Sequence, residues 1–251
     1  MKSLTLTGSS LDYDPSRSQE VAKRLLEGFS GTLQCDGFSS YVAVWEKQGF
    51  CQLGCFDDAR RKFIEAINAQ PKAKRTPSKL TKAEVALRKI NALYRIEREI
   101  KDFTATEKYL NRQQRSVPLL NDLKIWLDAN LSRVVKGELT YKAIFYALNQ
   151  WEKLIRYCED GRFFISNVAA ENALRPFVIG RKRWLFSDTP KGAHASAVHY
   201  SLVETAKANN LDPQAYYEYV LKKLPYADSV EKLEALLPWN VQADIEKNHH
   251  N

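Results

Sequence analysis

The chain has 251 residues, of which 44% are hydrophobic and 27% charged, with a formal net charge of +8. This composition is typical of a globular protein, and the length allows one large domain or two ordinary ones. The positive charge favours polyanionic partners, and no apolar run is long enough to cross a bilayer, so we expect a cytoplasmic location and no membrane partner.

The first 58 residues have an α/β pattern. Apolar positions in 17–29 recur at helical spacing, and residues 32–36 form a short strand-like run that ends in an Asp-Gly turn signal. The run 41–45 fits a helix or a strand. Residues 50–56 predict a further buried strand that ends at Asp57 and Asp58.

Residues 59–160 predict a helical region. Its first part, 59–101, carries thirteen Lys or Arg against four Glu, and a Pro-bounded basic segment at 71–78 predicts a loop. An apolar stripe from Ala83 to Phe103 predicts a helix of about 25 residues. Helical patterns from Pro118 and over 141–158 supply packing partners, so the region is expected to form antiparallel helices.

After Gly161 the pattern predicts a return to the core over 161–190, and a helical element with a polar tail over 191–251. The run 163–165 is strand-like, and Ser166 or Asn167 is suited to cap a helix that carries Glu171. Helices are expected at 193–209 and 213–223, joined at 210–213, with the polar tail beginning after 237–239.

The cysteine pattern does not favour a disulfide scaffold or a zinc site. Cys51 and Cys55 have a spacing that zinc sites use, but no second Cys/His pair completes four ligands at the usual spacing. We therefore expect these two residues, with Cys35 and Cys158, to be reduced thiols.

Glu171 lies at the start of its predicted helix among cations that suit phosphate contacts. These cations are Arg175, Arg181, Lys182 and Arg183. Asp36 ends a predicted strand on the other side of the helical region, which is how a ribonuclease-H-like core with a large helical insertion would present two carboxylates. Phosphodiester chemistry can use divalent metals held by such carboxylates, so we expect Asp36 and Glu171 to lie about 4–8 Å apart.

Several segments resemble the insertion sequence 66 family of bacterial DDE transposases. Residues 166–176, Ser-Asn-Val-Ala-Ala-Glu-Asn-Ala-Leu-Arg-Pro, are similar to the family's Asp-Asn-Asn…Glu-Arg-Ala-Leu-Arg-Pro run. Residues 33–41 resemble its Leu-Gln-Thr-Asp-Gly-Tyr…Tyr segment. Residues 54–63 resemble its next motif, with Asp58 where a His is expected, and 92–97 and 200–207 resemble later elements. Departures include Ser166 for Asp, Val168 for Asn and Asn172 for Arg.

The resemblance implies a transposase fragment that cleaves and joins double-stranded DNA at insertion-sequence ends and targets, near the bacterial nucleoid. It implies an N-terminally truncated ribonuclease-H-like α/β fold in which helix predominates, with Mg²⁺ or Mn²⁺ as cofactor. Asp36 and Glu171 would be catalytic metal ligands, and the first Asp of the acidic triad would lie upstream of the segment that resembles 12–18. DNA contacts are expected at Arg60, Arg61, Lys62, Arg175, Arg181, Lys182 and Arg183, and in the basic stretch 72–82.

Other interpretations remain open. Asp36-Gly37 is also an ordinary turn dipeptide, Glu171 and Arg175 are also a common i,i+4 helix pair, and the 181–183 run is also a solvated charge cluster. The chain could be an inactive DNA-binding remnant, could self-associate, or could act with a complementing N-terminal polypeptide. A basic scaffold for RNA or membranes ranks third. The 251-residue chain alone is expected to lack cleavage activity.

Overall fold

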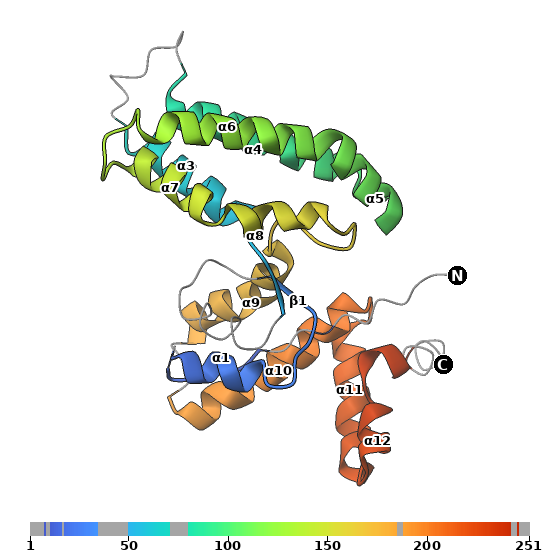
Figure 1. The fold of residues 1–251 in the computed structure, drawn as a ribbon. Helices are drawn as coiled ribbons and strands as arrows, with labels where there is room; N and C mark the ends of the chain where they lie inside the picture. The colour runs from blue at the N-terminus through green and yellow to red at the C-terminus, as the bar shows by residue number, and fades with distance from the viewer. Residues whose placement is uncertain are drawn as a thin grey trace. The chain divides into compact units, whose positions relative to one another are not determined.

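The computed structural model describes residues 8, 11–16, 18–34, 50–70, 80–184, 188–241 and 245, without the side chains of 169 and 181–184. The described residues are mostly helical, as the sequence predicts, with one small parallel sheet (Figure 1). The chain forms two compact units. Unit 2 is Arg17–Val168, and unit 1 combines Met1–Ser16 with Ala169–Asn251.

Unit 2 begins with helix α1 (Gln19–Leu25) and strands β1 (Thr32–Gln34) and β2 (Cys51–Leu53). The strands pair in parallel, with Thr32 opposite Cys51 and Gln34 opposite Leu53. The predicted strand at 50–56 is therefore too long. Phe56 instead starts helix α3, and Asp57 and Asp58 occupy its first turn, where carboxylates interact favourably with the helix dipole. The 41–45 run lies outside the described residues.

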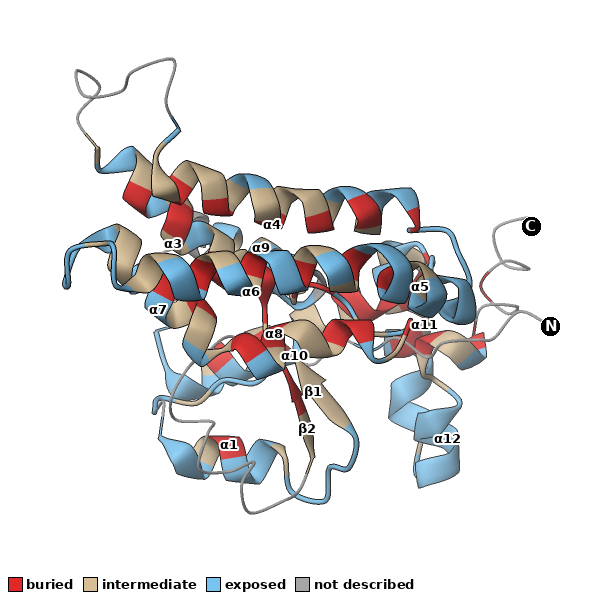
Figure 2. Cartoon of the chain, turned by 45° about the horizontal axis from the view of Figure 1, so that its top comes forward, coloured by how far each residue is buried: buried red, intermediate tan, exposed pale blue. Residues whose placement is uncertain are grey.

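The rest of unit 2 is helical, in agreement with the periodic apolar pattern. The elements are α3 (Phe56–Asn68), α4 (Lys82–Glu99), α5 (Ala105–Asn111), a π-helical turn η3 (Arg112–Ser116), α6 (Val117–Leu131), α7 (Leu139–Asn149), α8 (Trp151–Ile155) and the 3₁₀ turn η4 (Arg156–Cys158). Helix α3 packs on α4 and α7, and α6 packs on the same two helices. Figure 1 shows these helices side by side, and Figure 2 shows the buried positions of α4 on the side that faces its neighbours.

The core of unit 2 fills the space between these four helices. Its fully buried side chains include Phe63, Ile90, Leu93, Leu127 and Ile144. Burying a side chain of this size contributes about 1.5–3 kcal/mol, so the bundle supplies most of the apolar stabilisation in this unit. The long predicted helix over 83–103 ends earlier than expected, at Glu99, and begins with a capping box between Thr81 and Glu84.

The segment that follows η4 corrects the sequence prediction. Residues 163–165 form no strand, because their carbonyl oxygens accept hydrogen bonds from three separate elements. Phe163 O accepts from Arg112, Phe164 O accepts from Gln34, and Ile165 O accepts from the backbone N–H of Phe56. A strand would pair these carbonyls with one neighbouring strand.

Unit 1 contains α9 (Val168–Trp184, whose first residue belongs to unit 2), α10 (Pro190–Ala208), α11 (Pro213–Lys223), the 3₁₀ turn η5 (Leu224–Tyr226) and α12 (Val230–Glu234). The predicted joint at 210–213 is confirmed: Asn210 adopts a left-handed φ of 59°, and the Asp212 side chain caps α11. The polar tail begins later than predicted, because Val241 and Ile245 are buried against Tyr216 and Val220.

Candidate functional site

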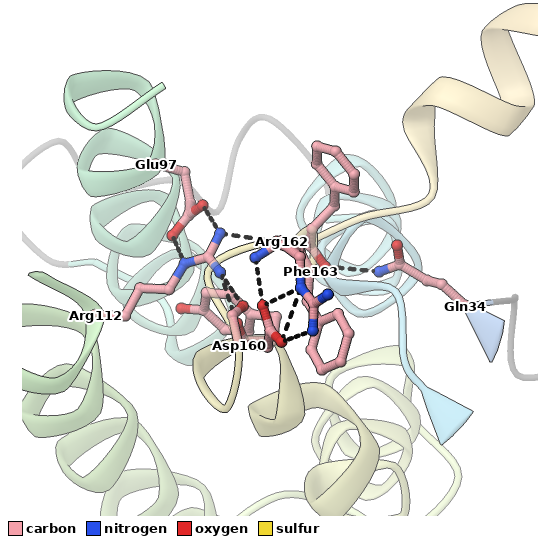
Figure 3. Close-up of polar contacts among 8 residues, drawn as sticks. Gln34, Glu97, Arg112, Asp160, Arg162 and Phe163 are labelled. Carbon is pink, nitrogen blue, oxygen red and sulfur yellow. Dashed lines mark hydrogen bonds and ion pairs between the residues drawn. The ribbon is translucent and has the colours of Figure 1, made fainter. Parts of the chain in front are cut away.

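Gln34, the last residue of β1, joins three parts of unit 2 through its side-chain amide. Its Nε2 donates to the carbonyl oxygen of Gly54 at 3.0 Å and to that of Phe164 at 2.8 Å. Both hydrogens of the amide nitrogen are thus used. The contact fixes the end of β1, the residue after β2, and the segment that leads to α9. Figure 3 shows the Gln34 amide reaching this segment.

Two further contacts hold the same segment beside the start of α3. The backbone N–H of Phe56 donates to Ile165 O at 3.0 Å, and the Cys55 thiol donates to Oδ1 of Asn167 at 3.0 Å. Burial raises the pKa of the Cys55 thiol, which keeps the proton that this bond needs. Asn167 immediately precedes α9 and Cys55 immediately precedes α3, so this bond joins the residues before the two helices.

Arg112 holds the preceding turn from the opposite direction. Its Nε and Nη2 form a bidentate pair with Glu97 at 2.9 and 2.6 Å. Nη1 donates to Tyr157 O at 2.7 Å and to Asp160 O at 2.9 Å, and Nη2 also donates to Phe163 O at 2.9 Å. A guanidinium has five N–H donors, and all five are used here (Figure 3). Arg112 is therefore a structural junction between α4, η3 and the segment before α9.

Asp160 and Arg162 shape the turn itself. The Asp160 carboxylate accepts from the backbone N–H of Arg162 at 2.8 Å and from its guanidinium at 2.6 Å. The Arg162 guanidinium lowers the pKa of this carboxyl below its ordinary value. The Arg162 side chain is 77% exposed and that of Asp160 25%, so the pair contributes little to stability, but it defines the turn that presents Phe163 O to Arg112.

Glu171 lies in the first turn of α9 and is exposed, with Arg175 exposed one turn later. The helix dipole at this end favours a carboxylate or a bound anion. Pro176 lies inside α9 and removes one helical N–H donor. Beyond it, Phe177 packs edge-to-face against Tyr200 of α10, with ring centroids 5.4 Å apart, which ties α9 to the rest of unit 1.

The other predicted site residues divide into two groups. Asp36 and the basic segment 71–79 lie outside the described residues, as do the side chains of Arg181, Lys182 and Arg183. The described cations of α3 have local contacts: Arg60 donates to Asn91, Arg61 pairs with Asp58, and Lys62 lies over the Tyr146 ring. These contacts do not test DNA binding, so the role of the three cations in it stays a prediction.

The described residues do not make a metal site by themselves. Across the described ranges, no group of three or more His, Cys, Asp or Glu side chains could hold a metal ion. Glu171 is the only one of the two predicted ligands within these ranges, so no catalytic step through a metal is derived from the geometry. Cys51 is partly exposed and Cys55 is buried, and both are free thiols, as the sequence predicts.

Sequence reasoning missed the two side chains that organise this region. Gln34 belongs to the motif around Asp36, and a polar residue at the end of a strand was a usable signal. Nothing in the sequence marks Arg112 as a buried residue, because the surrounding Arg-Gln-Gln-Arg run has the composition of a solvent-exposed helix face. The Arg112 side chain is nevertheless only 2% exposed.

Comparison with known protein families decides the relationship. Residues 7–195 match the model of the Transposase IS66 family. The chain belongs to this family. Residues 201–239 also match the IS66 C-terminal element, which in this IS66-family chain covers the end of α10, α11 and α12.

The IS66-family chain is also similar to curated bacterial proteins. The uncharacterized protein y4hP of Sinorhizobium fredii is 32% identical over 232 residues, which cover 89% of this chain and 42% of that protein. The uncharacterized protein y4jD of the same organism is 31% identical over 242 residues, covering 92% of this chain and 45% of that protein. The chain thus spans less than half the length of these relatives. No solved structure matches it significantly.

Among the described helices, none is both long and apolar enough to cross a membrane.

Proposed function

We propose that this chain forms part of the DNA-cleaving and strand-transferring region of an IS66-family transposase. Asp36 and Glu171 supply two of its carboxylates, and double-stranded DNA is the substrate. The family match over 7–195 and the resemblance of 33–41 and 166–176 to the acid-bearing motifs support this assignment. The divalent ion implied by the family, Mg²⁺ or Mn²⁺, would stabilise charge on the reacting phosphodiester.

The observation that supports the proposal is the hydrogen bond from Gln34, in the motif that contains Asp36, to the segment that precedes α9. Gln34 is two residues before Asp36, a span of at most about 7 Å in an extended chain. The same Gln34 side chain binds Phe164 O, four residues before the start of α9, and Glu171 is in the first turn of that helix. The residues that precede the two carboxylates in sequence are therefore in contact within unit 2.

The secondary structure supports a ribonuclease-H-like core with an inserted helical bundle. Strands β1 and β2 are parallel, and parallel strands require a crossover connection rather than a hairpin. The bundle of α3, α4, α6 and α7 lies in sequence between β2 and the helix that carries Glu171. In this proposal the bundle is an insertion, and the chain returns to the core at the segment held by Gln34 and Arg112.

The test is a DNA cleavage assay on the protein expressed from its complete natural reading frame. Its substrate is a duplex carrying the ends of the insertion sequence, and the buffer contains Mg²⁺ or Mn²⁺. We expect Asp36→Asn and Glu171→Gln each to abolish cleavage while leaving DNA binding intact, with the exposed Glu218→Gln as the matched control. Cleavage that persists in both variants would overturn the assignment of these carboxylates.

A second candidate function is DNA binding without cleavage. It is favoured by Ser166, which stands where the family motif has an Asp and is only 6% exposed, and by Asp58, which pairs with Arg61 where the motif has a His. For the 251-residue chain by itself we predict binding without cleavage. Metal-dependent cleavage that disappears in Glu171→Gln would reject this candidate.

A further inference from the structure

Helix α4 carries three exposed arginines on the face opposite its core contacts. Arg88, Arg95 and Arg98 are exposed, whereas Ala86, Ile90, Leu93 and Ile96 are buried in unit 2. Positions 88 and 95 are seven residues apart, so they lie on one side of the helix and about 10 Å apart along its axis. Arg98 lies one turn beyond Arg95. Figure 2 shows α4 with its buried positions turned toward the neighbouring helices.

These three arginines make no direct polar contact within the described part of the chain. None of them has a hydrogen bond or ion pair there. The acidic residues of α4 have other direct partners: Glu84 closes the capping box with Thr81, Glu97 binds Arg112, and Glu99 pairs with Arg115. The pKa of Glu99 is lowered mainly by Arg115 and less by the charges of Arg95 and Arg98, so this carboxylate offsets part of their charge. The outer face of α4 is therefore a cationic surface.

Arg60 of α3 extends this surface. Its Nε donates to Oδ1 of Asn91 at 2.9 Å, and its guanidinium lies 5.6 Å from the centre of the Tyr94 ring. Asn91 falls on the same side of α4 as Arg88 and Arg95. Among the described residues, Arg60 uses only Nε for a hydrogen bond, so both terminal nitrogens are left as donors there. Asp57 is the nearby acid, and it accepts the Tyr94 hydroxyl at 2.7 Å.

The helix that presents these side chains is firmly fixed. It has 18 residues, a capping box at its start and core contacts along its length, and its Glu97 is bound to the buried Arg112. Arginines on such a helix need no ordering of the backbone when they bind, unlike arginines on a mobile loop. Planar guanidinium groups also match phosphate oxygens in a bidentate geometry.

We propose that Arg60, Arg88, Arg95 and Arg98, the α4 arginine stripe, form a binding surface for the phosphate backbone of duplex DNA. The inference rests on the proposed function and gives it a location on the helical bundle, separate from the two carboxylates. Phosphate contacts position a duplex without reading its sequence, so binding through this stripe is sequence-tolerant.

The experiment compares two variants of equal charge. One carries Arg88→Gln, Arg95→Gln and Arg98→Gln. The control carries Arg133→Gln, Lys136→Gln and Lys142→Gln, which are also exposed and have no side-chain partner in the described residues. Affinity for a duplex of about 20 base pairs is measured between about 50 and 200 mM salt. We expect the stripe variant to lose about 2–3 units of the slope of log K against log salt, and the control less than about 1.

A third variant separates charge from fold. Arg88→Lys, Arg95→Lys and Arg98→Lys keeps the three charges and should retain most of the slope, and all three proteins should melt at similar temperatures. Equal slopes for the stripe variant and its control would reject the α4 arginine stripe as the DNA-binding surface, although the chain would still bind DNA. No binding by the unmodified chain at about 50 mM salt would overturn the proposed function as well. Tighter binding of duplex RNA than of duplex DNA would overturn the assignment to DNA.

Discussion

Arg112 and Glu97 form a two-bond ion pair inside the helical bundle, with Nε and Nη2 of the arginine at 2.9 and 2.6 Å from the two carboxylate oxygens. The arginine comes from the π-helical turn before α6, and the glutamate comes from α4. The remaining donors of Arg112 bind three carbonyl oxygens between Tyr157 and Phe163. This one side chain therefore connects the bundle to the segment that leads to Glu171.

Replacing Arg112 with Met should lower the free energy of unfolding by about 3–5 kcal/mol, because Glu97 and three carbonyls lose their partner in a buried setting. Arg112→Lys should also destabilise, since an ammonium cannot reproduce the planar five-donor geometry. Urea unfolding followed by circular dichroism measures both effects. Arg115→Met, which breaks the exposed pair with Glu99, is the control and should change little. Equal losses at 112 and 115 would contradict the junction.

Gln34→Leu should remove the two hydrogen bonds to Gly54 O and Phe164 O and cost about 1–2 kcal/mol. We expect amide exchange to become faster in 163–167, and to change little in the bundle core. Gln114→Leu is a matched control, because Gln114 is exposed and has no side-chain partner in the described residues. If the amide exchange rates over 163–167 do not change in Gln34→Leu, the other contacts are sufficient to hold this segment, and the proposed role of Gln34 is wrong.

Much of the helical architecture follows from the sequence, for a physical reason. Helix α4 has both a periodic apolar face and a Thr81–Glu84 capping box, and α11 has Asp212 and Pro213 at its start. These signals are local, so a single sequence contains them. The 163–165 segment looked like a strand because its side chains are apolar, but its conformation depends on donors from Arg112, Gln34 and Phe56, which are distant in sequence.

The candidate site divides in the same way. Glu171 was placed correctly in the first turn of a helix, because the 166–176 run carries that information locally. Arg112 could not be identified, since its role depends on Glu97 and on carbonyl groups 45 to 51 residues away. These partners meet Arg112 only when the bundle is packed, so the sequence around residue 112 does not predict the contact.

Gly161 and Gly137 are both expected to resist substitution, the first because of a close backbone contact and the second because of its positive φ. A Cβ at Gly161 would lie 1.8 Å from the Ala105 carbonyl oxygen, whereas a Cβ at Gly137 would meet nothing within 4 Å. Gly137 has a φ of 95°, so Gly137→Ala should cost about 1–2 kcal/mol through backbone strain. Gly161→Ala should lower the free energy of unfolding by more than this, because the backbone at Ala105 or Gly161 must move to make room for the Cβ. Thermal unfolding of both variants is the measurement, and a smaller loss at 161 would contradict the close approach to Ala105.

Cys158 should make stability depend on pH in the alkaline range. Burial raises the pKa of its thiol to about 11, whereas an unfolded cysteine ionises near about 8.5. Between these values the unfolded chain releases a proton that the folded chain keeps, so the contribution of this group is complete at lower pH and is lost as pH rises. The free energy of unfolding of the chain relative to that of Cys158→Ala should therefore fall by roughly 3 kcal/mol from pH 8 to pH 11. A constant difference in urea unfolding across this range would contradict the raised pKa.

The three consecutive carbonyls of Phe163, Phe164 and Ile165 also affect the order of folding. Their donors lie at Arg112, Gln34 and Phe56, so the contacts close loops of very different lengths, up to 130 residues for Gln34. Contacts between distant residues form slowly, because loop closure costs entropy before the contact is gained. The helices of the bundle can form from local signals, whereas residues 163–165 need all three of these distant donors. We therefore expect residues 163–165 to reach their final conformation late, after the helices of the bundle have formed.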